Sequence, residues 1–542
     1  MKGRITAKER SKLIEVAESR VPRDQISSIF AYGPRIAGYD GGGPGVEIVI
    51  IAKNLKQIAV GPDEPAPKKP LPPVISEAAL LEEAKKPSPD ESVVNRFLNI
   101  YEPLLNAGFL ESTEMEYKKR VIAERLFEIQ TDYGDFSSNL VIPYEYLLFE
   151  KLHRRVLAHP DETSEIALTY SCAKGKENLE FTLKGFRAAA DLLAAQGIME
   201  KTSDSVRVFR GKRRETALSS LLKMYPLDTG STAQHAWHAL ANRAGYEFKT
   251  KPFPNPTISK RIKSNVKLDR PNKLLRLEEG VVFDDSSKLV EDLARVSGFP
   301  KKYRFKEKKK GDLINSSSEL EIWDGKRRVK YILKHFPEVK SSKWALLNLW
   351  SFASKKFNMS PLSRLNRELA AASRLRKLGI KTHRIIGVVL DDRTLVTEYV
   401  NGIPLDNSVE EITTGKSTDT SAIEQYGQVL GRLHKAGMVY GDTKPQNALV
   451  VKDGIELLDL EQAVEKGDPS WDLAEFLYYS AKLSKSNEGL KLVADAFLEG
   501  YRKVMPGKSV NGAKNPRYLA PFMMFLTPEK IGMVRDALKR HE

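Results

Sequence analysis

The chain has 542 residues, of which 41% are hydrophobic, so it is long enough for about three or four domains with substantial cores. Its net charge of +16 favours a polyanionic partner, nucleic acid above all, although a lysine-rich solvated surface would give the same composition. A single cysteine, Cys172, excludes an internal disulfide and a cysteine-based zinc site, and no apolar run reaches the ~20 residues of a membrane span, so we expect a cytoplasmic protein without a membrane partner.

The first 75 residues predict a small α/β domain that ends in a proline-rich linker. Residues 5–20 carry apolar and charged side chains at helical spacing, and Val46–Ala52 is an apolar run of strand length. The glycine-rich segment Ile29–Tyr39 lies between them, and residues 61–75 have the composition of a semi-rigid connector.

This order resembles the opening of the nucleotidyltransferase fold. In that family a Gly-Ser-Arg turn precedes a strand that carries two metal-binding acids, whereas here Tyr32–Arg35 replaces the turn, and Glu47 is followed by Val49 at the place of the second acid. One carboxylate cannot hold a two-metal centre. The resemblance therefore implies a degenerate domain that serves as a scaffold or binding surface, and an unrelated α/β domain is the alternative.

Residues 76–245 predict a helical domain that is closed by a hairpin. Four stretches have helical patterns, and they are residues 76–85, 91–108, Pro143–Leu157 and Leu179–Gln196. Residues 197–209 then read as two short strands, and helices followed by a β-wing resemble a winged helix. Basic residues that suit phosphate contacts follow this wing, and they are Arg210, Lys212, Arg213 and Arg214. Winged helices also bind proteins, so both partners stay open.

Residues 246–276 are rich in proline, lysine and arginine and predict a basic linker. Phe248 and Phe253 lie among the cations, so the segment could bind RNA by charge and stacking, or it could be a solvated tether.

The polar loop Gly441–Asn447 lies between apolar runs near the C-terminus. Asp453-Gly454 separates the two runs that follow it, which is a strong hairpin signal, and the second run ends at Asp459. The loop presents Asp442, Lys444 and Asn447. Phosphoryl transfer needs such a set, namely a carboxylate for the acceptor hydroxyl, a cation for the γ-phosphate, and oxygen ligands for Mg²⁺.

This spacing resembles the protein-kinase catalytic loop, in which Asp and Asn lie five positions apart and a metal-binding Asp follows a short hairpin. Tyr440-Gly441-Asp442 replaces His-Arg-Asp, Asp459-Leu460-Glu461 replaces Asp-Phe-Gly, and no long activation segment follows. These departures are similar to the atypical RIO and KEOPS kinases. The resemblance implies a bilobal fold with lobes at residues 277–400 and 401–542, and ATP and Mg²⁺ as cofactors. In it Asp442 orients the acceptor, Lys444 meets the γ-phosphate, and Asn447 and Asp459 bind the metal.

The same resemblance assigns nucleotide-binding residues to the first of these lobes. Three small residues, Ser316, Ser317 and Ser318, would let the backbone approach phosphate. Lys334 ends an alternating strand and is the expected phosphate lysine, with Lys330 as the rival, because period two places both on one face. Glu368 would pair with this lysine, and the segment Glu398, Tyr399 and Val400 would meet the adenine. Asp472, at a helix start, resembles the buried kinase Asp that accepts bonds from the catalytic loop.

Three functions remain open at this level. The resemblance implies an ATP-dependent kinase for protein serine or threonine. The second reading is an RNA kinase that phosphorylates a tRNA 2′-hydroxyl, because an archaeal relative of the KEOPS kinase does so and the basic charge fits RNA. The third is a non-catalytic RNA-binding scaffold or an ATPase switch.

Overall fold

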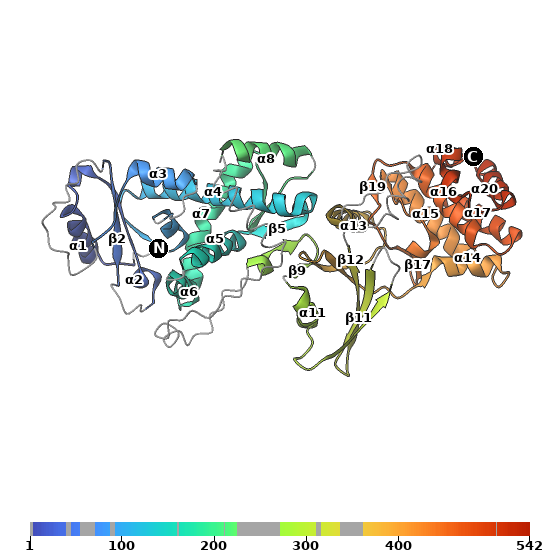
Figure 1. The fold of residues 1–542 in the computed structure, drawn as a ribbon, viewed down its shortest axis with the longest axis horizontal. Helices are drawn as coiled ribbons and strands as arrows, with labels where there is room; N and C mark the ends of the chain where they lie inside the picture. The colour runs from blue at the N-terminus through green and yellow to red at the C-terminus, as the bar shows by residue number, and fades with distance from the viewer. Residues whose placement is uncertain are drawn as a thin grey trace. The chain divides into compact units, whose positions relative to one another are not determined.

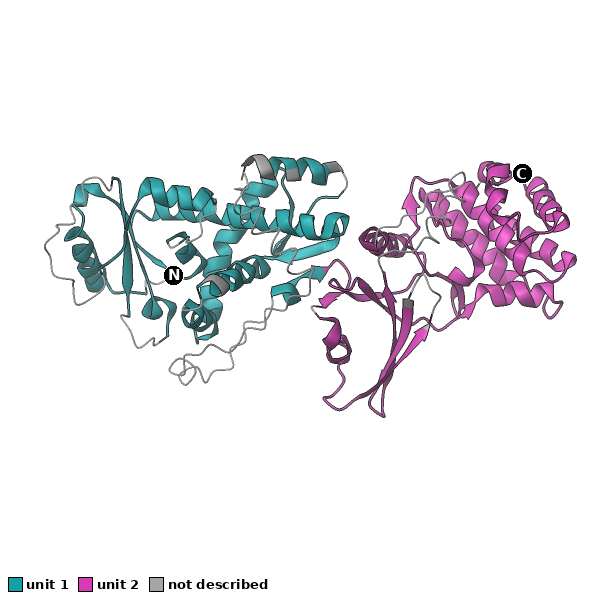
Figure 2. Ribbon diagram, in the orientation of Figure 1, with its two compact units in different colours: residues 1–276 teal, residues 277–542 magenta. Residues whose placement is uncertain are grey.

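The computed structural model describes residues 4–39, 45–54, 71–86, 91, 93–159, 162–210, 212–224, 271–283, 285–310, 316–336, 361–505 and 507–542. The chain divides into two compact units, residues 1–276 and residues 277–542 (Figure 2). In the part of the chain described here, no helix is both long and apolar enough to cross a lipid bilayer.

The first unit opens with a mixed sheet of strand order β3-β2-β1-β4. The strands are β1 Ile26–Tyr32, β2 Glu47–Ala52, β3 Val74–Ser76 and β4 Glu102–Leu105, and β1 runs antiparallel to both β2 and β4. The predicted first helix is confirmed as α1 Ala7–Glu18, which begins at a capping box made by Thr6 and Glu9. The short helix α2 Pro34–Ala37 follows Gly33, whose φ is +113°.

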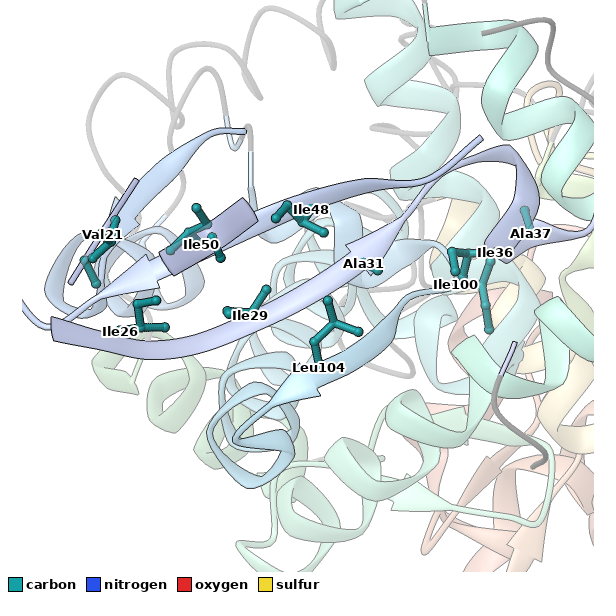
Figure 3. Packing of buried hydrophobic residues seen from close by; sticks show 12 residues of the cluster. Val21, Ile26, Ile29, Ala31, Ile36, Ala37, Ile48, Ile50, Ile100 and Leu104 are labelled. Atoms are coloured by element: carbon teal, nitrogen blue, oxygen red, sulfur yellow. The ribbon is translucent and has the colours of Figure 1, made fainter. Parts of the chain in front are cut away.

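Aliphatic side chains from this sheet form one buried core (Figure 3). Ile29 of β1, Ile50 of β2 and Leu104 of β4 lie in the cluster together with Val21 and Ile36. Because β3 and β4 come from beyond residue 73, this sheet extends past the predicted domain boundary at residue 75, and Val74 and Ile75 belong to a strand rather than to the linker.

The predicted helix at residues 91–108 is wrong. The segment forms a 3₁₀ helix, Val94–Leu98, and then strand β4, in which Pro103 pairs with Phe30 of β1. A proline lacks a backbone N–H donor and clashes with the preceding turn inside a helix, so Pro103 disfavours a helix here. The apolar residues at helical spacing are buried by the 3₁₀ helix and the strand instead. The neighbouring prediction is confirmed, because α3 spans Glu77–Lys85.

Helices and a small sheet make up the rest of the first unit. They are α4 Ala107–Tyr133, the 3₁₀ helix Gly134–Asn139, β5 Leu140–Pro143, α5 Tyr144–Ala158, α6 Thr163–Ser171, α7 Gly175–Ala195, β6 Glu200–Lys201, β7 Ser205–Arg207 and α8 Lys212–Met224. Strand β7 pairs antiparallel with both β5 and β6, which confirms the predicted hairpin. The nucleotidyltransferase-like and winged-helix-like assignments stay predictions.

Two of the basic residues after the hairpin make contacts inside the unit. The Arg213 guanidinium lies 3.9 Å from the Phe209 ring centre, and Arg214 pairs with Asp135 at 2.5 Å. Their role in phosphate binding stays a prediction, and most of the predicted linker 246–276 lies outside the described residues, which resume with a 3₁₀ helix at Pro271–Leu274.

The second unit begins with a mixed sheet whose pairs are mainly antiparallel. Its elements are β9 Val281–Phe283, α11 Leu289–Val296, β10 Arg304–Lys310, β11 Ser316–Trp323, β12 Arg328–His335, α13 Pro361–Lys377, β13 Ile385–Val389 and β14 Thr394–Glu398, with β8 Arg276–Leu277 at the unit boundary. The strands lie in the order β10-β11-β12-β14-β13-β9. Helix α11 packs Leu293 against Leu320 and Ile322 of β11 on one face of this sheet (Figure 1).

The remainder of the second unit is mainly helical (Figure 1). Its elements are β15 Ile403–Pro404, α14 Leu405–Thr413, α15 Ser421–Lys435, β16 Met438–Val439, β17 Ala448–Val451, β18 Gly454–Leu457, β19 Val464–Glu465, α16 Pro469–Leu483, α17 Asn487–Arg502, α18 Lys508–Ala513, α19 Pro516–Leu519 and α20 Pro528–Arg540. The predicted hairpin is confirmed as β17 and β18. Helices α15 and α17 pack closely at glycines, since a Cβ on Gly500 would lie 2.0 Å from the Glu424 carbonyl oxygen.

Candidate active site

A buried carboxylate holds the loop that carries Asp442. The backbone amides of Tyr440 and Gly441 donate to the two carboxylate oxygens of Asp472 at 2.6 and 2.8 Å. Asp472 lies in the first turn of α16 and is fully buried, and His434 of α15 lies 3.0 Å from it. The structural role predicted for Asp472 is confirmed, and charge-assisted bonds of this kind are among the strongest a loop can have.

A second acid and a tyrosine extend this support, and the sequence did not predict either. Thr443 donates its amide to Glu475 of α16 at 2.8 Å. The Tyr440 hydroxyl donates to the carbonyl oxygens of Asn447, at 2.7 Å, and Leu458. Leu458 in turn donates its amide to the Asn447 carbonyl at 2.8 Å, so the end of the loop lies beside the residue that precedes Asp459.

The polar side chains of the loop contact one another. Lys444 lies 2.8 Å from Asp442, and Asn447 donates its side-chain amide to the Asp442 carbonyl at 3.0 Å. The Lys444 ammonium also lies 5.5 Å from the centre of the Tyr479 ring. Burial opposes the charge of Lys444, but the Asp442 carboxylate outweighs it and raises the pKa of Lys444 above its usual value. Lys444 is therefore a permanent cation beside Asp442.

Lys334 lies at the centre of a second cluster. Its ammonium lies 2.6 Å from Asp459, 3.1 Å from Glu368 of α13 and 3.5 Å from Glu461. Burial alone would lower the pKa of Lys334, but the three carboxylates raise it, Asp459 most. Lys330 lies on the same face of β12 and is 37% exposed, and its ammonium lies 2.9 Å from Glu319 rather than in this cluster.

Asp459 has an uncommon backbone conformation, with a φ of +50°. A positive φ is rare for residues other than glycine, although Asp tolerates it better than most, and such residues gather at functional sites. Burial raises the pKa of Asp459, but the Lys334 ammonium outweighs this effect and lowers it, so Asp459 is ionised. Burial also raises the pKa of Glu368, against the opposing effect of Lys334.

Glu461, Arg364 and His383 complete the cluster, and the sequence did not predict them. Arg364 lies 2.8 Å from Glu461, and it precedes Glu368 by four positions, so Arg364 and Glu368 share one face of α13. His383 Nε2 lies 3.3 Å from Glu368, and burial, followed by the nearby Lys334, lowers the pKa of His383 to about 3. The i, i+4 spacing of Arg364 and Glu368 was the signal available in the sequence.

The carboxylates of this cluster form the candidate metal centre. One oxygen from each of Glu368, Asp459 and Glu461 lies within 4.8 Å of the others. The predicted ligand Asp459 is a member, whereas the predicted ligand Asn447 lies at the end of the neighbouring loop.

The three predicted serines begin strand β11 rather than form a loop. Ser317 pairs across the sheet with Lys334, and Ser318 pairs with Leu333 and donates its hydroxyl to Glu307 at 2.6 Å. The backbone of Ser316, Ser317 and Ser318 therefore takes part in strand pairing, and the turn before it, residues 311–315, lies outside the described residues.

The predicted adenine segment follows the end of β14. The Glu398 amide donates to the Arg384 carbonyl at 2.9 Å, and the Tyr399 amide donates to the Lys330 carbonyl at 3.1 Å. Both of these N–H groups are therefore already bonded, which leaves the Val400 amide as the donor of the segment that a purine edge could use.

Comparison with known proteins places this region in a family. Residues 347–477 match the family model described as the RIO domain. The chain is 25% identical over 143 residues to the "Probable bifunctional tRNA threonylcarbamoyladenosine biosynthesis protein" of Methanospirillum hungatei, which covers 26% of this chain and 25% of that protein. It is 29% identical over 133 residues to the protein of the same name from Methanoculleus marisnigri, with 24% of this chain and 23% of that protein covered.

A third relative carries a kinase name. The chain is 28% identical over 142 residues to the "Probable serine/threonine-protein kinase BUD32 homolog" of Archaeoglobus fulgidus, which covers 26% of this chain and 66% of that protein. The chain thus spans about a quarter of the length of the bifunctional relatives it matches. Together with the RIO match, these similarities support an atypical RIO and KEOPS kinase-like family for this region of the chain.

Proposed function

We propose that the chain is an ATP- and Mg²⁺-dependent phosphotransferase that moves the ATP γ-phosphate to a hydroxyl, with protein serine or threonine as the acceptor. The observation that carries this proposal is the convergence of Lys334, Glu368 and Asp459, which come from a strand, a helix and the segment after a hairpin. A lysine held by a helix glutamate beside an ionised aspartate is the arrangement that phosphoryl transfer in kinases requires.

Lys334 would bind the α- and β-phosphates. Glu368 is 1% exposed and lies 3.1 Å from the ammonium, so it limits where this flexible side chain can reach. The Lys334 contact with Asp459 would be exchanged for phosphate oxygens when nucleotide enters, and Glu368 would keep the lysine in place.

The residues beside Lys334 fit a magnesium ion. Mg²⁺ prefers oxygen ligands, and Asp459 and Glu461 offer carboxylates. Asn447 uses its side-chain nitrogen on the Asp442 carbonyl, so its side-chain oxygen points away from that bond and suits a cation. Asp459 and Asn447 would hold the ion, with Glu461 as a further carboxylate, and bound Mg²⁺ would neutralise charge on the transferring phosphoryl group.

Asp442 and Lys444 would act on the acceptor side. Asp442 would accept a hydrogen bond from the acceptor hydroxyl and orient it towards the phosphorus atom. Lys444, whose pKa is raised, would neutralise the γ-phosphoryl oxygens at every physiological pH. The bonds from Asp472 and Glu475 fix the loop backbone, so these two side chains start from a defined position.

A second acceptor is favoured by a separate observation. Two of the similar proteins are named for tRNA threonylcarbamoyladenosine biosynthesis, and this chain has a net charge of +16. An RNA 2′-hydroxyl is therefore the alternative acceptor. The nucleotidyltransferase-like and winged-helix-like modules would be the candidate RNA-binding parts of the chain. A non-catalytic RNA-binding scaffold or an ATPase switch is the remaining alternative.

Labelled ATP separates these functions. The full chain and its Asp442→Asn variant are incubated with [γ-³²P]ATP and Mg²⁺, and either a total protein extract or total tRNA is added. Label on protein that requires Asp442 supports the first acceptor, and label on tRNA supports the second. Free phosphate alone indicates an ATPase, and no turnover by the wild-type chain refutes the proposed activity.

A further inference from the structure

The sheet face that carries Lys334 continues as a basic surface away from the candidate active site. Alternate residues of a strand share a face, and the registers of β10, β11 and β12 set which side chains are neighbours. Successive cross-strand rows on this face are Arg304–Trp323–Arg328, Lys306–Glu321–Lys330, Lys308–Glu319–Ile332 and Ser317–Lys334. Helix α11 packs on the opposite face, so this one is not the core side.

The carboxylates on this face are used by the cations of β12. Lys330 lies 2.9 Å from Glu319, and Arg328 lies 3.3 Å from Glu321. The side chains of Arg304, Lys306 and Lys308 are exposed, and within the described ranges none of the three forms an ion pair with a carboxylate. Strand β10 therefore presents a row of exposed cations, with a spacing of about 7 Å between alternate side chains, and cations outnumber carboxylates on this face.

An aromatic ring lies at the end of this row. Trp323 is half-buried between Arg304 and Arg328 in the register, and the Arg328 guanidinium lies 5.7 Å from its ring centre. Proteins that bind single-stranded nucleic acid combine a basic track for the backbone with aromatic rings on which bases stack.

Protection of a sheet edge does not account for the whole pattern. Lysines on an edge strand prevent strand pairing between molecules, and β10 is the terminal strand in the order β10-β11-β12-β14-β13-β9. Trp323, however, lies on β11, where it pairs with Arg304 of β10 on one side and with Arg328 of β12 on the other, so an exposed strand edge does not explain it. A ligand that is negatively charged and carries flat rings explains both groups of residues.

We propose that Arg304, Lys306, Lys308, Trp323 and Arg328, here called the β10–β12 face, bind single-stranded nucleic acid. The backbone phosphates follow the cations of β10, and one base stacks on Trp323. This site is distinct from the nucleotide site at Lys334, and its binding does not depend on phosphoryl transfer.

The test measures binding of the full chain to fluorescein-labelled twelve-residue oligo-U RNA, oligo-dT DNA of equal length and a duplex RNA, by anisotropy at several salt concentrations. The triple variant Arg304→Glu, Lys306→Glu and Lys308→Glu should bind oligo-U at least tenfold more weakly. In a plot of log affinity against log salt concentration, the slope of this variant should be shallower by about 2 than that of the wild type, because each of the three lost phosphate contacts to a single strand contributes about 0.7 to the slope. Trp323→Leu should weaken binding about tenfold and leave the slope unchanged.

A matched control carries the same change of net charge elsewhere on this unit. Lys485, Lys491 and Arg502 are exposed cations on the helical part, and their triple replacement by Glu should leave oligo-U affinity within twofold of the wild type. Equal losses in both triple variants, or tight binding of duplex RNA alone, would overturn the proposal. So would equal competition by poly-glutamate, which would indicate an acidic protein. Tighter binding of RNA than DNA, or the reverse, decides which nucleic acid the face prefers.

Discussion

The contrast between Lys334 and Lys330 gives the sharpest test of the candidate active site. Lys334→Met would leave Glu368 and Glu461, which are 1% and 6% exposed, without their shared cation. Removing one partner of a buried pair costs about 3–5 kcal/mol of unfolding free energy. Lys330→Met breaks an exposed pair with Glu319, which is worth about 0–1 kcal/mol.

ATP turnover should separate the two lysines in the same way. Loss of one charged group that stabilises the transition state costs roughly 10²–10³ in kcat, so Lys334→Met should lose that much activity and Lys330→Met should stay near wild type. Stability is measured by urea unfolding followed by tryptophan fluorescence, and turnover by phosphate release or acceptor labelling. The double variant Lys334→Met and Glu368→Gln should regain part of the stability but none of the activity. Full activity in Lys334→Met together with inactivity in Lys330→Met would refute this reading of the cluster.

Three further predictions address other contacts. Asp472→Asn should lower the free energy of unfolding in urea by about 2–3 kcal/mol, because two amides of the loop that carries Asp442 lose a charged acceptor. If the proposed function holds, kcat should fall as well, and an unchanged kcat would contradict this role. The folded chain keeps His383 neutral down to its pKa of about 3, whereas a histidine in the unfolded chain takes up a proton below about pH 6.5. The free energy of unfolding of the wild type should therefore fall by about 2 kcal/mol at pH 5, relative to that of His383→Asn. Parallel curves of stability against pH for the two proteins would exclude this effect. Gly500→Ala should overpack the contact between α17 and α15, which lowers the free energy of unfolding by about 1–3 kcal/mol and with it the melting temperature. Gly532→Ala on α20, where a Cβ would meet no atom within 4 Å, should not lower the melting temperature.

The loop Gly441–Asn447 and the hairpin after it could be predicted from the sequence because their information is local. Asp442, Asn447 and Asp459 have fixed spacings along the chain, and the Asp-Gly turn between two apolar runs specifies the hairpin that separates them. The spacing alone could not decide between Lys334, the expected phosphate lysine, and its rival Lys330, because period two gives both the same face. The deciding information is which carboxylates the fold brings to each lysine, and Glu368 and Asp459 lie far away in sequence.

Helix α4 could not be predicted for a different reason. Its Lys118 and Arg120 side chains are fully buried, so charged residues interrupt the buried face of the helix. The sequence therefore lacks the regular apolar spacing from which an amphipathic helix is predicted. Burial is possible because Arg120 pairs with Glu91 at 2.7 Å and with Glu124 at 2.6 Å. The false helix at residues 91–108 is the converse error, since apolar residues at helical spacing there are buried by a 3₁₀ turn and a strand.

The phenol of Tyr440 has a consequence for how this kinase-like domain moves. One hydroxyl bonds to the segment that ends in Asn447 and to the segment that leads into Asp459, so a displacement of either is passed to the other. The segment that carries Asn447 and the segment that leads into Asp459 are thereby linked through a single ring, and they should move as one body. Replacement of Tyr440 by phenylalanine would remove both hydrogen bonds and let the two segments move independently.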